Sequence, residues 1–133
     1  MTHTPSKKLK IYLATPYSLV GARHFKKYYG KLIEERRFRA VTKVAARWME
    51  EGFNIFSPIT MSHPVGRCLS STASDDHEFW LGIDFAWIDC CDELWVFQQD
   101  EWKESYGVQK EIEYAKAKGM PVRYLSKWGD MMW

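Results

Sequence analysis

A single glutamate interrupts an otherwise apolar helical stripe near the C-terminal end of the sequence. Glu111 lies three residues after Val108 and four residues before Ala115, so a helix places all three on one side. A carboxylate in that position faces the interior or the rim of the fold. The alternative is a flanking glutamate that pairs with Lys110 or with solvent, and spacing by itself leaves both interpretations open.

A second carboxylate also lies among apolar neighbours. Asp84 follows Trp80 by four residues and precedes Ile88 by four residues, so it is difficult to place in solvent on a helix. Two carboxylates with different environments can divide the work between a nucleophile and a proton-handling partner. Glu111 and Asp84 are therefore our candidate catalytic pair.

The residues just before Glu111 have the composition of a helix start. Ser105 is a natural N-cap, and Gly107 leaves the backbone N–H groups of the first turn approachable. The N-terminus of a helix can bind an anion such as a phosphate. Capping alone would also explain Ser105, so the sequence allows either role.

The elements that must position these residues alternate between strands and helices. Apolar runs rich in β-branched and aromatic residues predict strands at 9–14, 53–56, 93–97 and 121–125. Spacings of three and four predict helices at about 28–51, 76–90 and 106–118. This order predicts an α/β fold, a small Rossmann-like three-layer sandwich with a mostly parallel sheet of four to five strands. A polar, mobile loop is expected at 70–76.

Ligands of such sheets bind beyond the carboxyl ends of the strands. That rule places Thr15, Tyr17 and Ser18 on the binding rim, together with the segments 57–58 and 98–105. Arg23 follows the first of these loops and could meet a phosphate. Neither a GxGxxG motif nor a P-loop motif occurs, so a standard dinucleotide or nucleoside triphosphate site is not supported.

Composition limits the remaining possibilities. The chain has 133 residues, of which 46% are hydrophobic and 27% charged, so we expect one folded domain over residues 1–133. No stretch is apolar enough to span a membrane, and we expect a cytoplasmic protein with reduced thiols.

Charged residues are unevenly distributed along the chain. Between residues 23 and 47 there are nine basic residues and two glutamates, whereas between 75 and 113 there are twelve acidic residues and two lysines. This acidic half argues against a nucleic-acid polymer as partner and favours a small ligand. No metal site is expected, because the His and Cys spacings match no standard zinc pattern. No organic cofactor is expected either, since the dinucleotide and P-loop motifs are missing.

Several segments, taken together, resemble the nucleoside 2-deoxyribosyltransferase superfamily. The resemblance covers about residues 9–125 and rests on the strand Ile11-Tyr12-Leu13-Ala14, on Asp84 eight residues before Asp92, and on the segment from Ser105 to Ala115. Ser62-His63-Pro64 is further similar to uncharacterised phage and bacterial relatives. The resemblance implies that Glu111 attacks the anomeric carbon of the substrate, that Tyr12 orients Glu111, and that Asp84 is catalytic.

The position six residues before the nucleophile divides that superfamily. Transferases that act on free nucleosides tend to carry Asp there, whereas nucleoside 5′-monophosphate N-glycosidases carry Ser, as this chain does at Ser105. A hydroxyl at a helix N-terminus can donate to a phosphate that a carboxylate would repel. We therefore expect hydrolysis of the N-glycosidic bond of a (2′-deoxy)nucleoside 5′-monophosphate.

Two other functions stay open. A base-exchanging deoxyribosyltransferase would share the covalent intermediate, and a nucleotide-binding module would hold the same ligands without chemistry. Relatives of this fold complete their sites across a subunit interface, and the chain is rich in aromatic residues, so a homodimer is also expected.

Overall fold

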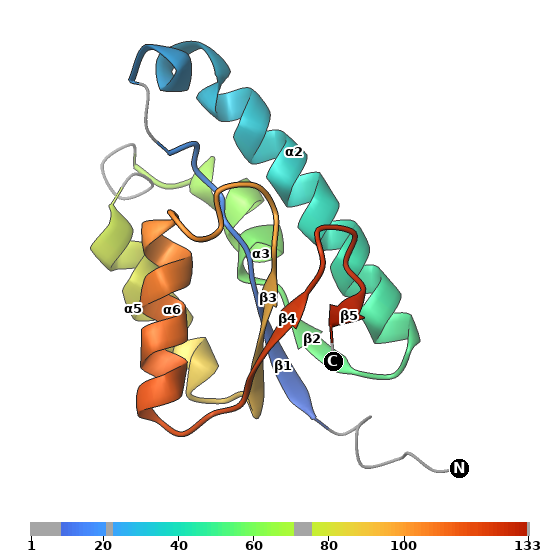
Figure 1. Ribbon diagram of the computed structural model, residues 1–133. Helices are drawn as coiled ribbons and strands as arrows, with labels where there is room; N and C mark the ends of the chain where they lie inside the picture. Colours follow the sequence, from blue (N-terminus) through green and yellow to red (C-terminus); the bar gives the residue numbers. More distant parts are fainter. Residues whose placement is uncertain (1–8, 21–22, 71–75, 133) are drawn as a thin grey trace.

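The computed structural model describes residues 9–20, 23–70 and 76–132, with the side chains of 23–28 excepted. The chain runs through the following elements: β1 (Lys10–Ala14), α2 (Arg23–Glu50), β2 (Asn54–Phe56), α3 (Pro58–Gly66), α5 (His77–Ile88), β3 (Glu93–Phe97), α6 (Tyr106–Ala117), β4 (Val122–Leu125) and β5 (Met131–Met132). Figure 1 shows a central sheet between α2 on one side and the α5–α6 pair on the other.

The sheet has five strands in the order β2-β1-β3-β4-β5. The first three pairings are parallel, and only β5 runs antiparallel to its neighbour β4. This confirms the predicted α/β sandwich with a mostly parallel sheet. The chain leaves β1 toward β2 on one side and later adds β3 on the other, so a crevice is expected at the carboxyl ends of β1 and β3.

Alternation along the strands gives the sheet two buried faces. Ile11 and Leu13 of β1 pack with Val41 and Val44 of α2 in one cluster. Tyr12 of β1 belongs to a second cluster, which faces α5 and α6. The buried members of this cluster are Tyr12, Ala14, Ile88, Leu94, Val96, Val108, Ile112 and Ala115. Because successive strand residues point to opposite faces, Tyr12 is directed toward the helix that carries Glu111.

The four predicted strands and three predicted helices are confirmed, with ends shifted by up to five residues. Two elements were missed. Helix α3 begins with Pro at its first turn and contains Pro64, and a second proline obscures a helical pattern because it normally ends a helix. Strand β5 has only two residues. Of the predicted mobile loop at 70–76, residues 71–75 lie outside the described residues.

Candidate active site

The site is built around a contact between the first strand and the last helix. The Tyr12 hydroxyl donates a hydrogen bond of 2.6 Å to Oε2 of Glu111, across 99 residues of sequence. Tyr12 is fully buried and Glu111 is 5% exposed. The flanking-glutamate alternative is thus wrong, because the carboxylate faces the sheet and Lys110 pairs with Glu113 instead.

Asp84 of α5 is the third member of this cluster. It is half-buried, and its carboxylate is close enough to affect the ionisation of both Tyr12 and Glu111. Helices α5 and α6 pack side by side on the same face of the sheet. The structure therefore brings together the two carboxylates that the sequence suggested and the tyrosine of the first strand.

Burial governs the protonation of this cluster. Loss of water raises the pKa of Glu111 well above its usual range, and the nearby Asp84 charge raises it further. Burial also raises the pKa of Asp84 to about 6, against hydrogen bonds to Glu111 and Tyr12 that lower it. The pKa of Tyr12 is raised by burial and by both carboxylates, so the phenol keeps its proton. The two carboxyl groups therefore hold a proton to a higher pH than separate carboxyl groups do, and a closely spaced pair can share that proton.

The cluster opens into a cavity of about 810 Å³ at the carboxyl edge of the sheet, a size within the range of small-molecule sites. Among the residues that the structure describes, its lining includes five carboxylates and two Lys or Arg cations: Glu34, Glu35, Asp84, Glu104, Glu111, Lys31 and Arg67. The remaining lining includes Thr15, Tyr17, Ser18, His63, Ser105 and Gly107. One cavity therefore joins nearly all of the predicted site residues.

The start of α6 has the predicted local structure. The Ser105 oxygen accepts a 3.3 Å hydrogen bond from the Val108 N–H, so Ser105 is an N-cap whose own hydroxyl hydrogen can still be donated. A side chain at Gly107 would meet no atom within 4 Å, which means that the space beside this backbone is open. A ligand in the cavity can thus reach the first turn of the helix.

The residues after β1 have different surroundings. Thr15 donates to the Phe97 carbonyl at 3.0 Å, so its hydroxyl hydrogen is committed to β3. The Tyr17 hydroxyl lies 2.6 Å from Nδ1 of His63, and the Ser18 hydroxyl donates to Glu34 at 3.4 Å. The side chain of Arg23 lies outside the described residues.

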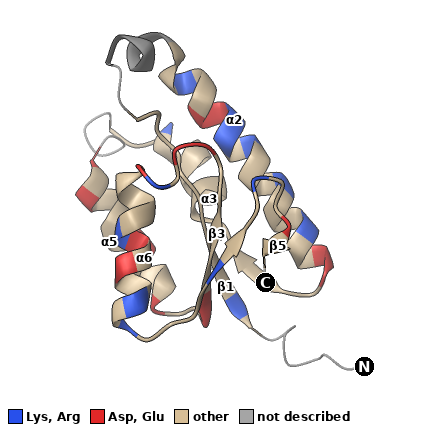
Figure 2. Cartoon of the chain, in the orientation of Figure 1, with Lys and Arg blue, Asp and Glu red and all other residues tan. Residues whose placement is uncertain are grey.

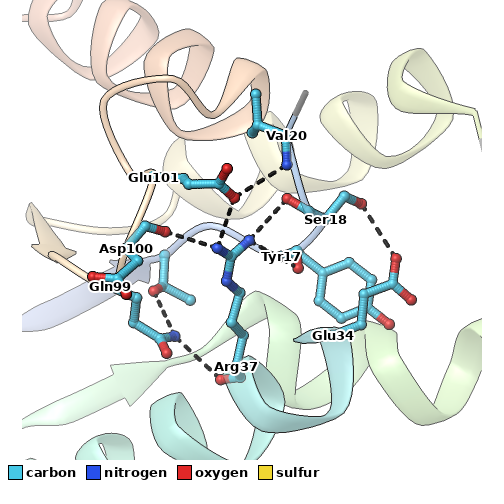
Figure 3. A network of polar contacts seen from close by, with 9 residues as sticks. Tyr17, Ser18, Val20, Glu34, Arg37, Gln99, Asp100 and Glu101 are labelled. Carbon is cyan, nitrogen blue, oxygen red and sulfur yellow. Dashed lines mark hydrogen bonds and ion pairs between the residues drawn. The ribbon is translucent and has the colours of Figure 1, made fainter. Parts of the chain in front are cut away.

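Sequence reasoning missed the residue that holds two rim loops together. Arg37 of α2 is 6% exposed and donates to the carbonyls of Tyr17, Ser18 and Asp100 and to the Glu101 carboxylate. Figure 3 shows its guanidinium group between the loop after β1 and the loop after β3. Figure 2 shows many basic positions along α2, the helix that contains Arg37, and a run of basic residues predicts a solvated face.

Glu101 completes this clamp from the second loop. Its carboxylate accepts from the Arg37 guanidinium at 2.9 Å and from the Val20 N–H at 3.1 Å. Its φ of 71° lies in the left-handed region, which non-glycine residues adopt at some cost and mainly where surrounding contacts require it. The clamp fixes two segments that border the cavity.

Residues 9–127 match the family model described as a domain of unknown function (DUF1937). The chain belongs to this family. The DUF1937 match includes every element from β1 to β4 and hence both carboxylates, Tyr12 and the clamp. A comparison with curated proteins finds no match.

The described part of this DUF1937 domain contains no helix that could cross a membrane, and no cluster of three or more His, Cys, Asp or Glu side chains arranged to hold a metal ion. All three of its cysteines are free.

Proposed function

We propose that this DUF1937 domain hydrolyses the N-glycosidic bond of a (2′-deoxy)nucleoside 5′-monophosphate through a covalent ester on Glu111. The observation that carries the proposal is the buried contact between Tyr12 and Glu111, with Asp84 beside them, in a cavity large enough for a small molecule. The resemblance of these positions to the nucleoside 2-deoxyribosyltransferase superfamily supports the same chemistry.

The shared proton gives a balanced reaction. In the first step the proton of the carboxyl pair passes by way of Asp84 to a nitrogen of the base, while ionised Glu111 attacks C1′. The N-glycosidic bond breaks, its electron pair leaves with the protonated base, and an ester forms on Glu111. In the second step Asp84 takes a proton from water, which attacks C1′ and releases Glu111. The product sugar keeps the configuration of the substrate.

Free base is the product that tests this proposal. Incubation with a panel of nucleoside monophosphates, followed by chromatography, should show release of one or more bases. Exchange for an added free base, in place of hydrolysis, would instead identify a deoxyribosyltransferase. Binding without base release over hours would identify a binding module and refute catalysis. Homodimer formation and a cytoplasmic location remain proposals.

The pH dependence follows from the raised pKa of Asp84. Below about pH 6 the pair takes up its second proton and no carboxylate is left to attack. We therefore expect kcat/KM to fall about tenfold per pH unit on the acid side of pH 6. A profile of kcat/KM between pH 4.5 and 8 measures this, and a flat profile down to pH 5 would contradict the shared-proton mechanism.

Ser105 decides between a nucleotide and a nucleoside. Because carboxylates outnumber cations among the described residues of the cavity lining, we assign the phosphate to the local donors at the start of α6. A charge-assisted hydrogen bond of about 1.5–3 kcal/mol corresponds to roughly tenfold to a hundredfold in kcat/KM. We expect Ser105→Ala to lose that much of the preference for a monophosphate over its nucleoside, and Ser105→Asp to lose more through repulsion.

The cap provides the control for this comparison. Asp is itself a good N-cap, so Ser105→Asp should preserve the helix start, and any change in preference then reports on the phosphate. The measurement is kcat/KM for one nucleotide and its nucleoside in the three proteins. An unchanged preference in Ser105→Asp would mean that Ser105 is only a cap.

A further inference from the structure

A second polar arm reaches the same cavity from the opposite face of the sheet. Tyr17 follows β1, and its hydroxyl lies 2.6 Å from Nδ1 of His63 in α3. The two rings meet edge to face, with centroids 5.6 Å apart. His63 is 9% exposed and stacks on Phe38 of α2 at 4.3 Å. The imidazole is therefore held on one face by Phe38 and at its Nδ1 edge by Tyr17.

The other nitrogen of His63 is held by a carboxylate. Nε2 lies 2.8 Å from Oε1 of Glu35, and Arg39 and Arg67 also donate to Glu35. These donors lower the pKa of Glu35, with the hydrogen bonds from Arg39 and then His63 as the largest causes. A carboxylate can only accept, and Glu35 lies closer to Nε2 than the Arg67 guanidinium does at 3.1 Å, so we assign a hydrogen to Nε2. In the neutral ring Nδ1 is then the acceptor, and the Tyr17 hydroxyl donates to it.

The hydroxyl hydrogen of Tyr17 stays within the protein in either state of His63. Glu34 is the other acceptor within reach of this phenol, so a charged His63 that donates from Nδ1 would turn the hydrogen toward Glu34. Burial raises the pKa of Tyr17, Glu34 and Glu35 raise it further, and Arg67 opposes them, so Tyr17 remains a neutral phenol. What Tyr17 can offer to a ligand in the cavity is an acceptor lone pair.

We propose that the Tyr17 oxygen and the Glu34 carboxylate form an acceptor subsite that selects substrates whose base carries an amino group. The inference rests on the proposed function, which places the sugar at Glu111 and the phosphate at the start of α6, both on the α5–α6 face. The base then extends toward the wall built by α2, α3 and the loop after β1. Lys31 also lines the cavity, and Arg67 pairs with Glu35.

In this arrangement His63 and Glu35 are positioning residues. They direct the Tyr17 hydrogen away from the ligand, and they need not contact the ligand themselves. Without the His63 ring nitrogens, the phenol hydrogen would turn to Glu34, and the lone pair of Glu34 that accepts it would no longer be open to the ligand. The preference for an amino group therefore depends on Tyr17, His63 and Glu35 together.

The test compares substrates that differ in one amino group. The probes are dCMP against dUMP and dAMP against dIMP, which share sugar and phosphate within each pair. For whichever pair is turned over, we expect kcat/KM to favour the amino-bearing member by about tenfold to a hundredfold. The ratio is unaffected by the folded fraction of a preparation, because both substrates are measured on the same protein.

Two variants and one control test whether Tyr17 and His63 cause the ratio of kcat/KM between the amino-bearing substrate and its partner. Tyr17→Phe removes the acceptor, and His63→Phe keeps the stacked ring but removes both nitrogens, so each should reduce the ratio at least about fivefold. Tyr114→Phe deletes the same atom outside the cavity, where the hydroxyl bonds to Asp89 at 2.7 Å, and should leave the ratio unchanged. A wild-type ratio near one, or a ratio that Tyr17→Phe leaves intact, overturns the proposal.

Equilibrium binding separates this inference from the proposed function. If no base is released from any probe, the hydrolase proposal fails, and calorimetric titration of wild type with the same pairs decides the subsite. Tighter binding of the amino-bearing member, lost in Tyr17→Phe, would sustain it. Equal binding within each pair, or no binding at all, would overturn it.

Discussion

Replacing Glu111 by Gln should lower base release by at least about 10³-fold while the protein stays folded and continues to bind its ligand. The amide keeps the shape of the side chain and can still accept the Tyr12 hydrogen bond of 2.6 Å. It cannot form the glycosyl ester, and loss of a nucleophile removes most of the rate enhancement. Single-turnover assays of base release on wild type and Glu111→Gln measure the effect. Turnover within tenfold of wild type would rule out Glu111 as the nucleophile.

The same variant should be more stable than wild type above neutral pH. Burial raises the pKa of Glu111 in the folded protein, so the folded state binds more protons than the unfolded state between the ordinary pKa of about 4.3 and the raised one. Wild-type stability therefore falls as pH rises through that window, and the uncharged amide avoids this loss. The gap in Tm between Glu111→Gln and wild type should widen from pH 5 to pH 8.

Glu113→Gln is the matched control for both readouts. Glu113 lies two residues further along α6 with a side chain that is 68% exposed, and it pairs only weakly with Lys110 at 3.7 Å. The change of charge is the same, but the site is on the solvent side of the helix. Activity and the pH dependence of Tm should match wild type.

The helices and strands could be predicted from the sequence because each has a hydrophobic pattern of its own within a few residues. Strand β3 consists of Glu93 and four apolar residues and is followed by polar ones, and its observed ends are the predicted ends. Glu111 could be placed on the inner side of α6 because helical spacing relates it to Val108 and Ala115. The order of the elements then implied the parallel sheet. These inferences need only neighbours within a few residues.

The polar contacts that shape the cavity could not be predicted in this way, because they join residues that are far apart in the sequence. His63 meets Tyr17 across 46 residues and Glu35 across 28, and no periodicity connects these positions. Arg37 differs from the other basic residues of α2 only by its place on the helix, where the loops after β1 and β3 converge on it. A charge run predicts a solvated face on average, and only the packing of the loops shows that Arg37 is buried, unlike the other basic residues of α2 whose side chains the structure describes.

Arg37→Met should lower the free energy of unfolding by about 1–3 kcal/mol, the range seen when hydrogen-bonded groups lose a buried partner. Arg37 is 6% exposed and donates to three carbonyls and the Glu101 carboxylate, and Met fills similar space without any donor. Water can replace part of the lost contacts, because the side chain of Glu101 is 29% exposed. Denaturant unfolding of both proteins at pH 7 measures the difference.

Arg36→Met provides the matched control, because Arg36 precedes Arg37 on the same helix but is exposed and makes no hydrogen bond or ion pair among the described residues. Its free energy of unfolding should stay within about 0.5 kcal/mol of wild type. In a double-mutant cycle, Glu101→Gln should cost less in Arg37→Met than in wild type, since the guanidinium that faces it has already gone. If Arg37→Met costs no more than Arg36→Met, the two rim loops are held by other contacts and the clamp has no structural role.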